Sequence, residues 1–147
     1  MRSLAAIVAL CVVCACSPPA QQPEISDDTI AGETQTDPLA AALTPVLAED
    51  IGLPVSLAVT TSTTDGDWGW LIAQPWTPEG AAIDWSQTRH AARAAEGALD
   101  GAGTTYALLR RQNGQWQVVE FAVGPTDAAW ADWAERHGAP ASLMRTD

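Results

Sequence analysis

The sequence predicts an α+β domain, in which two hairpins form a four-stranded antiparallel sheet with helices packed on one face. The first observation is a pair of turn signals, Asp65-Gly66 and Asn113-Gly114, each between two runs of alternating apolar and polar residues. The second is the helical spacing of apolar residues before, between and after these runs. Strands joined by hairpins are antiparallel, so the order helix, hairpin, helix, hairpin, helix favours the α+β class.

The first predicted helix begins at Asp37-Pro38 and ends at Gly52. An aspartate can cap a helix, a proline suits its first position, and a glycine commonly ends it. Pro45 lies inside this helix and favours a kink or a break.

The first hairpin is predicted from strands at 54–64 and 68–74. Pro75 is expected to end the second strand, because proline cannot donate a ladder hydrogen bond. Alternation in this strand places three large side chains on one face: Trp68, Trp70 and Ile72.

The second half of the domain is predicted as a helix, a hairpin and a helix. The alanine-rich stretch 86–99 favours the helix, and 104–111 with 116–123 favours the hairpin. In the second strand, Val119, Phe121 and Val123 are expected on one face, with Trp116, Val118 and Glu120 on the other. The last helix is predicted to open at Thr126 or Asp127 and to bury Trp130 and Trp133.

The start of the chain has the pattern of an export signal. Arg2 precedes the apolar run 4–15, which is too short to span a membrane, since a spanning helix needs about 20 apolar residues. The run ends in Val13-Cys14-Ala15-Cys16, which resembles the lipobox of bacterial lipoproteins. That resemblance implies cleavage before Cys16 and acylation of its thiol, with palmitate among the expected modifications. An unlipidated secreted protein is the alternative.

The sequence then divides into three predicted parts: a signal peptide (1–15), a tether (16–37) and a single α+β domain (38–147). The tether is acidic and contains prolines, a composition typical of disordered segments. All three cysteines lie in the signal or at the anchor, so we expect no disulfide in the domain.

The chain is strongly acidic, with a formal charge of −11 and 18 acidic residues. Cleavage would remove Arg2 and leave six arginines, for a side-chain balance of −12. Such a surface repels the phosphates of nucleic acid, so a nucleic-acid partner is excluded from our expectations. The charge suits solubility and is compatible with cationic partners or divalent ions.

A second resemblance covers residues 106–133. The pattern GxWxVVxFxxGPTDxxW, over residues 114–130, resembles a family of small secreted bacterial proteins without an assigned function. The resemblance implies an exported α+β domain and carries over no catalytic residue.

Seven tryptophans are the most distinctive feature of the composition. Trp70, Trp76 and Trp85 are candidate ligand-binding residues, because indole faces stack on sugar rings and exposed aromatic residues often mark binding sites. The alternative is that tryptophan fills the core of a domain that has one Phe and one Tyr.

The polar residues suggest no catalytic or metal-binding constellation, and no cofactor is expected. His90 and His137 are the only histidines, and a surface or capping role is the simplest interpretation of each. Arg110-Arg111 is expected to pair with Glu120 across the second hairpin.

These observations favour a lipid-anchored, non-enzymatic domain of the cell envelope that binds a protein or an envelope component. The alternatives are a sugar- or peptidoglycan-binding module and an enzyme with an unfamiliar acidic site. We expect a monomer facing the periplasm. Ser17, in place of the aspartate that retains enterobacterial lipoproteins at the inner membrane, favours the outer membrane.

Overall fold

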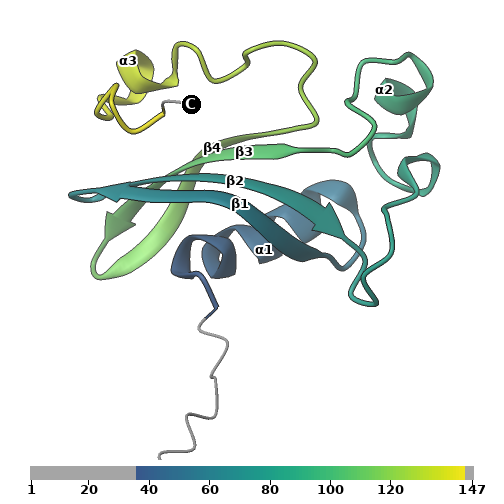
Figure 1. The fold of residues 1–147 in the computed structure, drawn as a ribbon, viewed down its shortest axis with the longest axis horizontal. Helices are drawn as coiled ribbons and strands as arrows, with labels where there is room; N and C mark the ends of the chain where they lie inside the picture. Colours follow the sequence, from purple (N-terminus) through teal and green to yellow (C-terminus); the bar gives the residue numbers. More distant parts are fainter. Residues whose placement is uncertain (1–35, 145–147) are drawn as a thin grey trace, which may run out of the picture. The chain divides into compact units, whose positions relative to one another are not determined.

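The computed structural model describes residues 36–144, and its central feature is a four-stranded antiparallel sheet (Figure 1). The strands lie in the order β1-β2-β3-β4. Their bounds are β1 Ser56–Asp65, β2 Trp68–Trp76, β3 Thr105–Gln112 and β4 Gln115–Val123. The predicted α+β class and the two hairpins are thus confirmed.

The turn of the second hairpin shows why its sequence signal is strong. Gln112 pairs with Gln115, so Asn113 and Gly114 form a two-residue loop. Their φ angles are +52° and +79°. A two-residue turn that matches strand twist needs such positive values, which Asn and Gly adopt at little cost.

Helix α1 (Pro38–Ile51) forms as predicted from its capping residues. The Asp37 carboxylate accepts hydrogen bonds from the backbone N–H groups of Leu39 (2.8 Å) and Ala40 (3.0 Å). Gly52, with φ +88°, ends the helix. The helix continues through Pro45 without a break, because its buried residues hold it on the sheet: Leu39, Ala40, Leu43, Leu47 and Ile51.

Both faces of the sheet are covered, whereas the sequence predicted helices on one face. Leu71 and Leu109 belong to the core cluster under α1, while Trp70 and Leu108 belong to a second cluster with Trp133. Neighbouring strand residues point to opposite faces of the sheet. Large apolar residues at consecutive positions are therefore buried only if a segment packs on each face as a cover. The second cover is the C-terminal segment with helix α3 (Trp133–His137), across the sheet from α1 (Figure 1).

The predicted helix 86–99 is replaced by two short elements, η1 (Trp85–Gln87) and α2 (Ala91–Ala95). The Thr88 hydroxyl donates to the Trp85 carbonyl at 2.8 Å and accepts from the His90 N–H at 3.1 Å. Such side-chain bonds compete with helix formation. α2 buries no residue, so packing does not extend it. The last predicted helix is also shorter, and turns precede α3.

A bulge in β4 changes the predicted faces of that strand. Leu108 pairs with Glu120 and Leu109 with Val118, so Val119 is an extra residue. Alternation therefore reverses at Val119. The residues that pack on the α1 side are Trp116, Val118, Phe121 and Val123.

Strand β2 continues through Pro75 to Trp76, beyond the predicted end. β3 pairs with β2 only as far as Ala73, while β1 still pairs with Pro75 through Leu57. Past Ala73 one side of β2 lacks a neighbouring strand, and a proline is tolerated at such an edge.

Candidate functional site

The three tryptophans predicted to bind a ligand do not form an exposed platform. Trp70 is completely buried, and Trp85 is 9% exposed. Trp76 is half-buried at the end of β2, where it forms an isolated bridge with Ala82. Only Trp76 could present part of its indole to a ligand, so stacking by the three residues together is not supported.

Trp70 lies instead in an aromatic cluster between the sheet and the C-terminal segment. Its ring meets Trp133 edge-on at 6.1 Å, and Tyr106 stacks on Trp130 at 3.8 Å. The Trp70 indole N–H is buried without a hydrogen-bond partner among the described residues. An unpaired buried donor costs about 1–3 kcal/mol, which the apolar packing of this cluster offsets.

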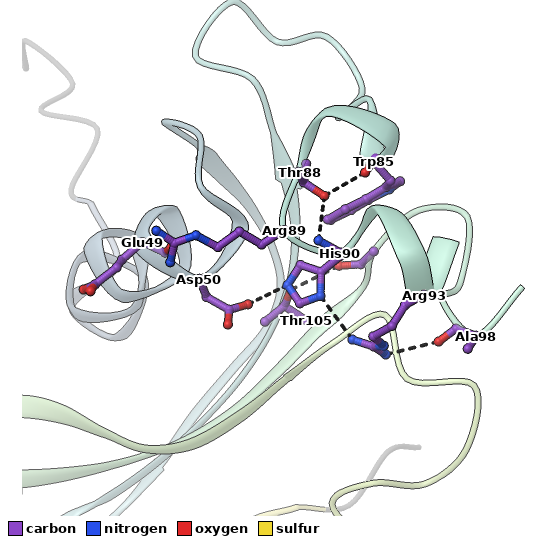
Figure 2. A network of polar contacts seen from close by, with 10 residues as sticks. Glu49, Asp50, Trp85, Thr88, Arg89, His90, Arg93, Ala98 and Thr105 are labelled. Carbon is purple, nitrogen blue, oxygen red and sulfur yellow. Dashed lines mark hydrogen bonds and ion pairs between the residues drawn. The ribbon is translucent and has the colours of Figure 1, made fainter. Parts of the chain in front are cut away.

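A polar cleft lies beside the end of α1. Asp50 Oδ2 is 2.7 Å from His90 Nε2, and Arg93 Nη1 is 3.3 Å from His90 Nδ1 (Figure 2). Arg93 Nη2 also donates to the Ala98 carbonyl at 3.1 Å. The cleft has a volume of about 530 Å³ and is lined on its other side by Thr126 and Asp127.

The geometry indicates a structural role for His90. Arg93 can only donate, so His90 Nδ1 accepts and the proton lies on Nε2, which donates to Asp50. Both ring nitrogens are then occupied within the chain. A general base needs a nitrogen within reach of a substrate proton, and His90 has none free in this arrangement. The histidine connects α1 to the segment that carries α2.

Arg89 strengthens the same connection. Its guanidinium lies beside Glu49 (Figure 2) and donates to the Glu49 carbonyl at 2.7 Å. Its backbone N–H donates to the Ile51 carbonyl at 3.0 Å. These carbonyls belong to the last turn of α1, where intrahelical donors are missing. The loop before α2 therefore caps α1.

Glu120 is the centre of a second polar cluster, on the opposite face. It accepts from Arg136 at 2.7 Å and lies 2.5 Å from His137 Nε2. Burial alone raises the pKa of Glu120, but the hydrogen bonds from His137 and Arg136 outweigh it and lower the pKa below 4.5. The hydrogen bond with Glu120 raises the pKa of Arg136. The cluster holds α3 against β4.

The predicted pairing of Arg110-Arg111 with Glu120 is wrong. Arg111 pairs with Asp67 at 3.2 Å, and Arg110 lies over the Trp68 ring at 5.0 Å. The bulge at Val119 and the partners on α3 explain the difference, because Glu120 faces the C-terminal segment.

An apolar groove follows the outer edge of β4. Its volume is about 550 Å³, and Ala42 and Val46 of α1 line one wall. The other wall is the run 116–121 of β4. Val46 is 37% exposed, which makes it one of two large hydrophobic residues with high exposure among residues 36–144. The groove is thus an apolar surface open to solvent.

Sequence reasoning did not find the groove or the Asp50–His90 pair. Each depends on segments far apart in the chain, and no local motif connects them. The helical spacing of Ala42, Val46 and Asp50 was the one available signal, because positions four apart lie on one side of a helix.

Comparison of the chain with protein-family models, with curated proteins and with solved structures finds no match in any of the three. Within residues 36–144, no group of three His, Cys, Asp or Glu side chains is placed to hold a metal ion. No helix in the same range is long and apolar enough to cross a membrane.

Proposed function

We propose that the chain is a lipid-anchored protein of the bacterial cell envelope whose folded domain binds another protein. The anchor is inferred from Val13-Cys14-Ala15-Cys16 and the apolar run before it, which lie outside the described residues. By the same inference the domain faces the periplasm, with the outer membrane favoured. The predicted tether, 16–37, also lies almost entirely outside the described residues, and a chain of about twenty such residues would hold the domain a few nanometres from the bilayer.

The observation that carries the binding role is the open apolar groove between α1 and β4. Its wall includes Trp116 and Phe121, and aromatic residues in a groove are typical anchors for a partner protein. The polar cleft supports binding over catalysis, because His90 and Arg93 are engaged with groups of the chain itself.

Replacement of Cys16 tests the anchor. Wild type is expected to label with a palmitate analogue, to fractionate with membranes and to show the mass of an acylated chain beginning at Cys16. Cys16→Ala should abolish labelling and leave the signal uncleaved, because the motif places acylation and cleavage at this residue. Cys14→Ala is the matched control and should label normally. Labelling that survives in Cys16→Ala would refute the anchor.

A further inference from the structure

We infer that β4 accepts an extended, cationic and apolar segment of a partner protein as a fifth strand of the sheet. The inference rests on the proposed function, since it names the kind of partner and the place where it binds. Strand addition draws affinity from main-chain hydrogen bonds and specificity from pockets for alternate side chains.

The outer edge of β4 is free within residues 36–144. β4 is the last strand of the sheet, and the backbone hydrogen bonds of 115–122 run to β3 alone. Beyond it, Gly124 returns to the loop before β3 by bonds with Thr104 and Asp100. The strand has 9 residues, which corresponds to about 30 Å of edge.

The groove lies along this edge and not over one face. Six consecutive residues, 116–121, line it. Consecutive strand residues point to opposite faces, so only a cavity against the edge meets all of them. An extended chain in this groove would have its backbone beside the free groups of β4.

The groove continues into the polar cleft. Phe121 lines both cavities, and the cleft carries on along β4 and the following loop to Asp127. On the other wall, Ala42 and Val46 line the groove and Asp50 lines the cleft. The path is therefore apolar at its first end and polar at its second.

Charge selects the occupant. The groove is lined by one carboxylate, Glu120, which Arg136 and His137 already contact, and by no basic residue, so the attraction comes mainly from the net charge of −11 on the whole chain. The cleft adds Asp50, which is in contact with His90, and Asp127, with Arg93 as its basic residue. A second copy of the chain is as acidic as the first, and the segment 17–36 carries acidic residues and no basic one. Both would be repelled, whereas a segment with Lys or Arg would be attracted.

The opposite edge of the sheet provides a contrast. β1 is mostly exposed, and polar Ser and Thr residues fill its second half. Val59 lies on this edge strand and is 40% exposed, close to the 37% of Val46. Val46 and Val59 have the same side chain and similar exposure. Val46 lines the groove beside β4, whereas Val59 lies in β1 at the opposite edge of the sheet, so the two make a matched pair for a test.

The experiment uses the mature, acylated chain in nanodiscs of phosphatidylcholine, with empty nanodiscs as the blank. The probe is a fluorescent peptide of alternating Lys and Val, equal in length to the 9 residues of β4, titrated by anisotropy. We expect saturable binding below about 1 mM, no binding of the Glu-Val counterpart, and loss of binding when alternate peptide nitrogens are methylated.

Val46→Arg should weaken the affinity for the Lys-Val peptide by about tenfold, because it places a cation in the groove. Val59→Arg should change binding by less than about twofold. Both positions are exposed, and thermal unfolding verifies that each variant folds. Absence of saturation, binding that survives methylation, or equal weakening by both variants would overturn strand addition. If the chain self-associates and Val46→Arg abolishes that association, the occupant of the groove is a second copy of the chain and not a partner protein.

A photo-crosslinker at Gln117 of β4 and another at Thr63 of β1 separate this inference from the proposed function. If a specific partner is captured in cells by the crosslinker at Thr63 and not by the one at Gln117, the domain still binds a protein, but the site on β4 is overturned. Normal acylation at Cys16 with no peptide binding would likewise leave the anchor intact and remove the strand-addition site.

Discussion

Asp50 and His90, forty positions apart, are joined by a 2.7 Å contact between Oδ2 and Nε2. The His90 side chain is 13% exposed and that of Asp50 is 36% exposed, so water screens the pair only partly. Arg93 occupies the other ring nitrogen. The end of α1 is thereby fixed to a segment that has little regular structure and no buried helix residue of its own.

Removal of either partner should destabilise the domain. We expect His90→Ala and Asp50→Ala each to lower the free energy of unfolding by about 1–2 kcal/mol in urea titrations. The double variant should lose less than the sum, because the two residues share one interaction. Glu49→Ala is the control, since its backbone carbonyl and not its carboxylate accepts from Arg89. Additive losses would show that the contact contributes nothing.

The sheet could be predicted because its signals are local. Asn113-Gly114 adopts the positive φ angles that a two-residue turn needs, and alternation marks the strands on each side. The start of α1 was also predictable, because Asp37 and Pro38 act within one turn. In these places local preference and tertiary structure agree.

The rest depends on contacts that a single sequence does not reveal. In β4 the alternation shifts phase at Val118-Val119, but two adjacent apolar residues do not by themselves show that one of them is bulged. The sequence shows where the tryptophans are but not which of them are buried, because the burial of Trp70 depends on the C-terminal segment that covers it. Likewise, alanines predicted a long helix where Thr88 and short-range bonds produce two brief ones.

The tryptophans differ in burial, and their replacement should show it. Trp70→Ala should cost about 3–5 kcal/mol of unfolding free energy, because it leaves a cavity in the aromatic cluster. Trp76→Ala removes a half-buried side chain at the end of β2 and should cost less than half as much. In single-tryptophan variants, acrylamide should quench the fluorescence of Trp76 and leave that of Trp70 largely unchanged. Equal losses of stability would contradict the assigned burial.

Gly103 supports the burial of Trp85. A Cβ at this position would lie 1.9 Å from Trp85 Cζ2, and the residue has φ +67°. We expect Gly103→Ala to cost about 2–4 kcal/mol by combining backbone strain with a clash in the core. Gly97→Ala is the matched control, with φ +70° and no neighbour within 4 Å, and should cost only about 1 kcal/mol. Similar losses in urea titrations would show that Trp85 moves away freely.

The Glu120 cluster should make stability depend on acid pH. Hydrogen bonds from His137 and Arg136 outweigh burial and lower the pKa of Glu120 in the folded state. A lowered pKa stabilises the fold above the unfolded value, near 4.5, and this stabilisation is lost as the pH falls through the folded value. Glu120→Gln should therefore unfold at a lower temperature than wild type at about pH 6, with the difference shrinking toward about pH 3. Glu135→Gln, at an exposed position of α3, should track wild type throughout. A difference between wild type and Glu120→Gln that stays constant across this range would mean that the carboxylate is not held ionised by α3.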